Sequence, residues 1–278
     1  MSASRGAVSP LGSSAAERAA LARLYDLDLL DDPGDLDLYR ALAARTGGPI
    51  LELAVGTGRL AGPLADDGYA VTGVDIDPAM LERARGRSAA PRLVEGDARS
   101  VRLADAGSYR LAFIALNSIM LVGDRRAQAE VVATLAAHLA PGGLAVVDVW
   151  LPDADDLARF DGRIVLEYPR RDPQGGQVVT KIGSAVHDAA SATVRLTTIY
   201  EEGEPGAPAV RWLREDTLRL VGAHELAAFA ELAGLEVETI AGGYGLEPLG
   251  PGDDRAVLVA TKPARPTKPA RPTNETGR

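Results

Sequence analysis

Acidic side chains around a pair of glycines are the feature of this sequence that most suggests chemistry. Glu52 lies inside the apolar run 50–54, just before Gly56-Thr57-Gly58. An apolar run followed by such glycines predicts a strand and a tight turn, in which a ligand can approach the backbone and free helical N–H groups. Asp75 ends the next predicted strand, where a carboxylate can accept hydrogen bonds from two ribose hydroxyls. Because a carboxylate at Glu52 suits a cationic group, these residues predict a nucleotide-like cofactor with positive charge.

The glycine turn by itself leaves a second cofactor open. Residues 56–61 also fit G-x-G-x-x-A, a fingerprint of dinucleotide binding, and Asp75 suits the ribose of either cofactor. This interpretation predicts an NAD(P)-dependent oxidoreductase. It gives no account of Glu52 or of the motif Gly96-Asp97-Ala98.

Four motifs in this order carry a resemblance to a known family. They occupy residues 51–59, 73–81, 96–98 and 139–143. Together they resemble the class I S-adenosylmethionine-dependent methyltransferases, over about residues 20 to 260. The sequence departs from the family at Ala54, where glycine is usual, and the extra methyl group narrows the cofactor cradle.

The resemblance implies a role for each residue of the cofactor site. It assigns Glu52 to the amino end of S-adenosylmethionine, usually through water, Asp75 to the ribose and Asp97 to the adenine amino group. Helix capping or a turn is the alternative role for the two aspartates. The other implied cofactor-binding residues are Ala54, Gly56 and Gly58 for the methionine portion, Ile76 and Met80 for the adenine faces (or as core residues), Ala98 for a ring nitrogen and Ala115 for the amino end.

Methyl transfer from a sulfonium requires alignment of a nucleophile and exclusion of water, and a base only if the nucleophile must lose a proton. Sugar N-methyltransferases of antibiotic pathways resemble this chain at residues 25–27 and 117–119 and often carry a polar residue near the place of Leu121. The first catalytic candidate is Tyr25, as a polar aromatic closing over the methyl group, or else a core or lid residue. The second is His187, on the predicted antiparallel layer, with a surface role as its alternative.

Other polar and aromatic residues near the predicted strand ends are weaker candidates. Asn117 and Ser118 follow a strand and could orient an acceptor or shape a turn. Trp150 and Tyr244 could form walls of an apolar pocket or simply pack. His138 lies near a helix C-terminus, where its charged form would suit the helix dipole, and we assign it no catalytic role.

Composition narrows the classes of function. The chain has 278 residues, a net charge of −9, three histidines and no cysteine, so disulfides are excluded and a metal site is not expected. An acidic protein is a poor ligand for nucleic acid. No apolar run is long enough to span a membrane and no signal segment is visible, so the expected location is cytoplasmic. We expect a small-molecule acceptor and no membrane partner, with a homodimer left open.

The order of predicted elements indicates an α/β protein. Strands and helices alternate up to about residue 150, as in a Rossmann-like parallel sheet with right-handed crossovers. Four strands between 161 and 221 predict an inserted antiparallel β layer, and the last two strands predict an antiparallel hairpin at the sheet edge. The expected boundaries are a disordered segment 1–14, a methyltransferase domain 15–262 and a disordered Pro-rich basic tail 263–278.

The function expected from the resemblance is transfer of a methyl group from S-adenosylmethionine to N or O of a small natural-product-like acceptor. A non-methylating member of the same fold, such as a cyclase or a regulator, is the alternative, because Ala54 and Leu121 depart from the relatives.

Overall fold

A computed structural model describes residues 14–204 and 206–264. Its larger sheet has seven strands in the order β10-β11-β5-β4-β1-β2-β3. Strands β1 to β5 are parallel, whereas β11 runs antiparallel between β5 and β10. The predicted Rossmann-like sheet with an antiparallel edge hairpin is therefore confirmed. The strands are β1 (Ile50–Leu53), β2 (Val71–Asp75), β3 (Arg92–Glu95), β4 (Tyr109–Ile114), β5 (Leu139–Trp150), β10 (Glu236–Ala241) and β11 (Arg255–Thr261).

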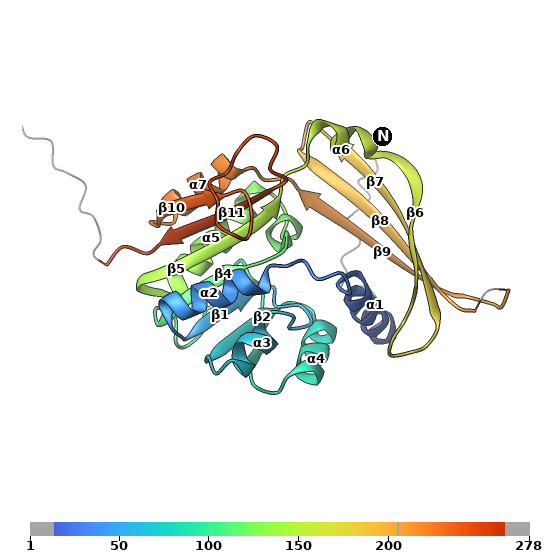
Figure 1. The fold of residues 1–278 in the computed structure, drawn as a ribbon, viewed down its shortest axis with the longest axis horizontal. Coiled ribbons are helices and arrows are strands. Elements are labelled where there is room, and N and C mark those ends of the chain that lie inside the picture. Colours follow the sequence, from blue (N-terminus) through green and yellow to red (C-terminus); the bar gives the residue numbers. More distant parts are fainter. Residues whose placement is uncertain (1–13, 205, 265–278) are drawn as a thin grey trace, which may run out of the picture.

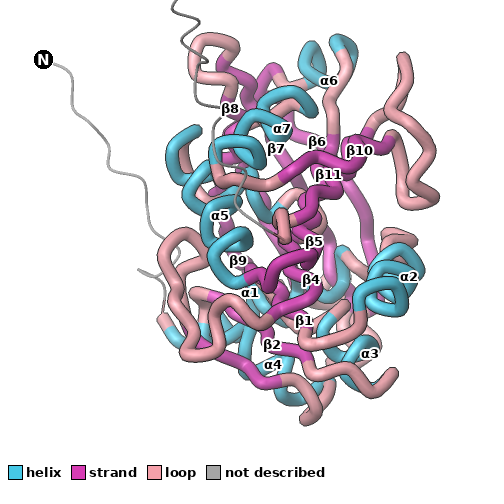
Figure 2. Tube along the Cα trace, turned by 90° about the vertical axis from the view of Figure 1, so that its left-hand side faces the viewer, coloured by secondary structure: helices cyan, strands magenta, loops and turns pink. Residues whose placement is uncertain are grey.

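Helices cover both faces of this sheet because its strands are apolar on both sides. Figure 2 shows α5 and α7 on one side and α2 and α3 on the other. Two hydrophobic clusters form, one under each helical layer, with Leu135 and Phe229 in the first and Tyr39 and Phe113 in the second. The helices of these layers are α2 (Leu36–Thr46), α3 (Ala61–Asp66), α4 (Pro78–Arg87), α5 (Arg125–His138) and α7 (Ala223–Leu232).

A second sheet of four antiparallel strands stands beside the larger one (Figure 1). It confirms the predicted antiparallel layer, and its strands follow one another along the chain. Helix α1 (Ala15–Asp28) lies between this sheet and the rest of the molecule, and its N-cap is Ser14, which accepts a hydrogen bond from the N–H of Glu17. The strands are β6 (Asp161–Arg171), β7 (Val178–Asp188), β8 (Thr193–Glu202) and β9 (Val210–Arg219).

Three local expectations need correction or addition. The sequence predicts a helix that Pro141-Gly142-Gly143 ends and then a strand over 144–150, but the chain enters β5 directly at Leu139, so these three residues lie within the strand. Two short helices were not expected, η2 (Ser118–Leu121) and α6 (Ala154–Arg159). The predictions of disorder for residues 1–13 and 265–278 lie outside the described residues.

Candidate active site

The turn after β1 adopts the left-handed backbone that its glycines favour. Gly56 and Gly58 have φ of 54° and 78°, and Ala54 is also left-handed at 55°. A Cβ atom on Gly58 would lie 3.1 Å from Cβ of Ala84 in α4, whereas one on Gly56 would meet only Tyr25, at 3.9 Å. Gly58 therefore allows the turn to pack on α4, and Gly56 leaves an open backbone face toward α1.

Glu52 is a buried carboxylate with one oxygen that lacks a hydrogen-bond partner. It is 4% exposed, and its Oε2 atom has no hydrogen-bond partner. Burial raises the pKa of Glu52 from 4.5 to about 8, although the Arg59 guanidinium opposes this shift. An orphaned acceptor of this kind is costly unless a ligand or water meets it.

Asp75 connects the end of β2 to the turn. Its Oδ2 accepts a hydrogen bond from the N–H of Gly56 at 2.8 Å, and its Oδ1 accepts one from Asp77 at 2.9 Å. Burial raises the pKa of Asp75, and these two N–H donors act in the opposite direction. Each oxygen retains a lone pair, so the carboxylate can still accept from ribose hydroxyls.

The residues predicted to lie against the adenine faces are more exposed than ordinary core residues. Ile76 is 48% exposed, which contradicts its alternative role as a core residue, and Met80 is half-buried. Asp97 pairs with Arg99, which lowers the pKa of Asp97. Its neighbour Ala98 is half-buried beside it. The Asp97 oxygens are thus ionised and partly exposed, as an acceptor for an amino group needs.

The loop after β4 is held in an uncommon conformation. Leu116 and Asn117 both have positive φ, 50° and 64°, directly after the buried Ala115. The Asn117 Oδ1 atom accepts the N–H of Trp150 at 2.5 Å, so Asn117 has the turn role among its two alternatives. Left-handed non-glycine residues concentrate at functional sites, where the surrounding contacts hold them in place.

Asp148 is a residue of this site that sequence reasoning missed. It is fully buried at the end of β5 and accepts from the N–H of Leu116, from Tyr244 Oη at 2.9 Å and from Arg255 at 3.3 Å. Burial raises the pKa of Asp148. A charged residue inside the apolar run 144–150 was the available signal, because the same reasoning singled out Glu52. Tyr244 was predicted as a pocket wall or packing residue, and in the structure its hydroxyl group donates this hydrogen bond to Asp148.

Tyr25 reaches the turn from α1. With Glu52, Ala54, Gly56 and Ala115 it lines a cavity of about 20 Å³. Burial raises the pKa of Tyr25, against the opposing effect of nearby arginines. The phenol therefore stays protonated near neutral pH and can donate or accept a hydrogen bond.

The histidines lie elsewhere. The backbone N–H of His187 donates to Phe160 at the α6 end of β7, and no contact joins His187 to the glycine turn among the described residues. His138 is buried, and its Nε2 accepts the N–H of Leu103 at 3.1 Å while its Nδ1 meets Thr134 O at 2.7 Å. Both ring nitrogens of His138 thus have partners in α5 and in the loop before β4, away from the glycine turn.

The inner face of the four-stranded sheet carries charge opposite the turn. Arg214 pairs with Asp216 in two hydrogen bonds, and both side chains are largely buried. Arg214 is close enough to Tyr25 to lower the pKa of its phenol against burial. Leu121, where relatives often carry a polar residue, is 45% exposed. Strand β9 thus presents a polar pair near Tyr25, and η2, which packs against β9, exposes the apolar Leu121.

Comparisons with known proteins agree with this geometry. A family model described as a methyltransferase domain matches residues 50–143. The chain is 30% identical to a cypemycin N-terminal methyltransferase from Streptomyces sp, covering 76% of this chain and 80% of that protein. It is 27% identical to a dTDP-3-amino-3,4,6-trideoxy-alpha-D-glucopyranose N,N-dimethyltransferase from Streptomyces venezuelae, covering 80% of this chain and 92% of that protein. The crystal structure of DesVI from Streptomyces venezuelae matches with a TM-score of 0.70 and 25% identity, covering 88% of this chain and 98% of that one.

The sheet and its glycine turn define a Rossmann-like fold with a nucleotide site at the carboxyl ends of its strands. The chain belongs to the class I S-adenosylmethionine-dependent methyltransferases, and it is an enzyme whose cofactor is S-adenosylmethionine. This membership favours the methyltransferase prediction over the oxidoreductase and non-methylating alternatives.

The site residues fit this cofactor. The orphaned oxygen of Glu52 suits a cationic amino group, the open face of Gly56 admits a ligand, and exposed Ile76 offers an apolar surface to a flat ring. S-adenosylmethionine, when bound, supplies a methyl group activated by a positive sulfur. No helix within residues 14–204 and 206–264 has the length and apolarity that a membrane span requires.

Proposed function

We propose that this methyltransferase transfers the methyl group to the nitrogen or oxygen of a small natural-product acceptor, bound between the glycine turn and the four-stranded sheet. The supporting observation is Tyr25, which stands beside Gly56 and lines the same cavity as Glu52. The relatives named above methylate an amino sugar and a peptide N-terminus, and an amine is accordingly the first acceptor to test.

The proposed roles of the cofactor residues follow from their geometry. Glu52 receives the amino end of the cofactor, and Asp75 receives the ribose hydroxyls through its free lone pairs. Asp97 and Ala98 meet the adenine edge, with Ile76 and Met80 against its faces. The remaining backbone contacts are those of Ala54, Gly56, Gly58 and Ala115.

The proposed catalytic role of Tyr25 is orientation. Because its phenol remains protonated, Tyr25 holds the acceptor by a hydrogen bond and does not remove its proton. An amine that arrives neutral needs no base before the transfer, and its surplus proton can leave to water afterwards. His187 stays a weaker candidate, because its contacts are at the far end of β7.

The test is incubation of the purified protein with methyl-labelled S-adenosylmethionine and a panel of nucleotide-linked amino sugars, short peptides with free N-termini and phenols. Mass spectrometry should find one or two added methyl groups on an amine, and Tyr25→Phe should lower kcat by about tenfold or more through loss of one oriented hydrogen bond. Labelling of RNA or DNA with no labelled small molecule would contradict the proposal.

We also propose that the protein forms a homodimer through the outer face of the four-stranded sheet. Leu166, Ile182, Ile199 and Leu213 are direct cross-strand neighbours in one row across all four strands. Leu166 is 62% exposed and Leu213 is 49% exposed. A continuous apolar row on an open sheet face favours burial against a matching surface.

A further inference from the structure

Helix α1 is anchored on two sides by aspartates that flank the same turn of helix. Asp28 faces the four-stranded sheet, where it accepts hydrogen bonds from Tyr168 at 2.5 Å and Tyr200 at 2.9 Å and pairs with Lys181 at 3.0 Å. Asp26 faces the opposite way, toward α4 and the glycine turn. Tyr25 precedes Asp26 in the chain, so its position depends on how α1 is held.

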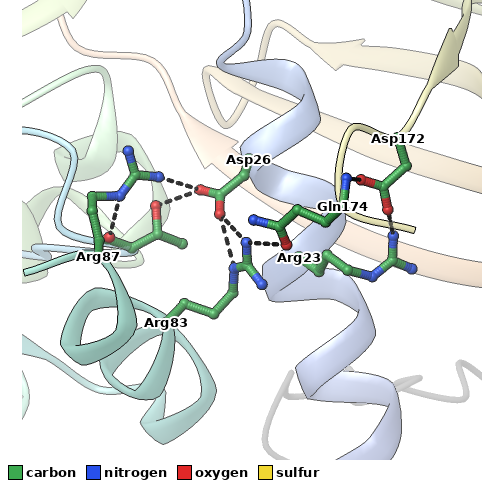
Figure 3. Close-up of polar contacts among 7 residues, drawn as sticks. Arg23, Asp26, Arg83, Arg87, Asp172 and Gln174 are labelled. Carbon is green, nitrogen blue, oxygen red and sulfur yellow. Dashed lines mark hydrogen bonds and ion pairs between the residues drawn. The ribbon is translucent and has the colours of Figure 1, made fainter. Parts of the chain in front are cut away.

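The Asp26 carboxylate is the meeting point of three side chains. It accepts from Thr57 Oγ1 at 2.6 Å, from Arg83 Nε at 2.8 Å and from Arg87 at 3.0 Å. Figure 3 shows Asp26 between the two arginines of α4 on one side and Arg23 on the other. The Asp26 side chain is 18% exposed, so these charge-assisted bonds are only partly screened by solvent.

Thr57 connects this cluster to the cofactor turn. It is the residue between Gly56 and Gly58 and is almost fully buried. Its hydroxyl donates to Asp26, and its carbonyl accepts from Arg87 Nε at 3.0 Å. The middle of the turn is therefore held at both its side chain and its backbone by the residues that hold α1.

The space between Tyr25 and Glu52 is narrow, whereas a larger cavity of about 200 Å³ lies on the Asp26 side of α1. The cavity between Tyr25 and Glu52 measures about 20 Å³, which is room for about one water molecule. The methionine end of the cofactor has to reach Glu52 through this space. A shift of α1 away from the turn would widen this path for a cofactor that enters or leaves.

We propose that Asp26 is a positioning residue that latches α1 onto the cofactor turn: its contacts with Thr57, Arg83 and Arg87 open during cofactor exchange and, when closed, place Tyr25 over the turn. The role of Tyr25 in this inference rests on the proposed function. The latch itself concerns cofactor exchange, so it can be tested without any acceptor, and its failure is distinguishable from failure of the proposed function.

The experiment compares Asp26→Asn with Asp28→Asn, a matched variant on the same helix whose partners belong to the sheet. Binding of S-adenosylhomocysteine is measured by calorimetry and its dissociation by chase with labelled ligand. For Asp26→Asn we expect the dissociation rate and the Kd to rise at least about tenfold, because the ion pairs with Arg83 and Arg87 lose their anionic partner. For Asp28→Asn both should stay within about threefold of the wild type, since its partners lie away from the turn.

The salt dependence of cofactor binding is a measurement that a purely structural role of Asp26 would not change. Raising NaCl from about 0.05 M to about 0.5 M should weaken wild-type binding, and the effect should shrink in Asp26→Asn because the latch is ionic. Arg83→Gln should reproduce the faster dissociation and serves if Asp26→Asn does not fold. Equal dissociation rates in Asp26→Asn, Arg83→Gln and the wild type, or equal losses in Asp26→Asn and Asp28→Asn, would overturn the latch.

Discussion

Burial decides the protonation of the carboxylate that the cofactor needs. With a pKa of about 8, Glu52 is mostly protonated at neutral pH before the cofactor arrives. A cationic amino group favours the ionised form, so binding at neutral pH must release a proton. In our proposal, the cofactor affinity of this protein is therefore coupled to pH through Glu52.

The first prediction concerns this coupling. Between about pH 6 and about pH 8 the affinity for S-adenosylhomocysteine should rise with pH, approaching tenfold per unit at the acid end. Glu52→Gln should bind more weakly and lose this dependence, because the amide does not titrate. Calorimetry in buffers of different ionisation enthalpy would also count the released proton. A wild-type affinity that is flat over this range would refute the coupling.

The same pKa has a consequence for stability. In the folded state Glu52 binds its proton up to about pH 8, and in the unfolded chain only up to about its ordinary 4.5. Its contribution is thus fully present below pH 4.5 and is lost as pH rises toward 8, by at most about 1.4 kcal/mol per pH unit. Glu52→Gln should remove this decline from the free energy of unfolding measured in urea.

Ala54 is strained by its left-handed backbone, φ 55°. Ala54→Gly should raise the free energy of unfolding by up to about 1 kcal/mol, because glycine adopts this conformation without a Cβ clash. Ala129→Gly, inside α5, is the matched control and should cost about 1 kcal/mol. Thermal unfolding measures both, and a destabilised Ala54→Gly would show that the alanine methyl contributes packing that outweighs its strain.

At the scale of elements, the alternation of strand-like and helix-like patterns predicted the sheets. This succeeded because the residues of each strand show by themselves that the strand is buried. The sequence predicts strands over about 92–95 and over 255–261, and β3 and β11 match them at both ends. The start of β5 was missed because pairing of Leu139 with Tyr109 overrides the local signal of Pro141-Gly142-Gly143. Tertiary pairing of this kind cannot be read from one segment.

The candidate site likewise contains residues that local patterns predict and residues that depend on distant contacts. Glu52, Asp75 and Gly56 could be predicted because strand ends and glycine turns follow local rules, and the structure brings all three together. The contacts of Asp26 and Asp148 could not, because each depends on chain segments more than thirty residues away.

The loop after β4 provides a prediction at this scale. Asp148→Asn should lower the free energy of unfolding by about 1–3 kcal/mol, because Arg255 and the N–H of Leu116 lose a charged acceptor in a buried place. Tyr244→Phe, which removes one neutral donor, should cost about 1 kcal/mol. Urea unfolding checks the order, and a larger cost for Tyr244→Phe would contradict this account of Asp148.

At the scale of the whole molecule, the outer face of the four-stranded sheet determines assembly in our proposal. Leu213→Asp introduces a charge in the middle of the apolar row and should convert a dimer to a monomer in light scattering after gel filtration. Cofactor affinity should be unchanged, because Leu213 points away from the inner face that carries Arg214. A wild-type protein that is monomeric at high concentration would refute the proposed homodimer.

Strand β11 ends at Thr261, paired with Leu144 near the start of β5, and Lys262 then donates to the carbonyls of Ala136 and Leu139. The backbone thus departs from the margin where the parallel strands begin, whereas the catalytic cleft opens where they finish. A resin, electrode or reporter attached just after Lys262 would begin on the side of the sheet opposite the glycine turn. This position therefore suits immobilisation of the enzyme.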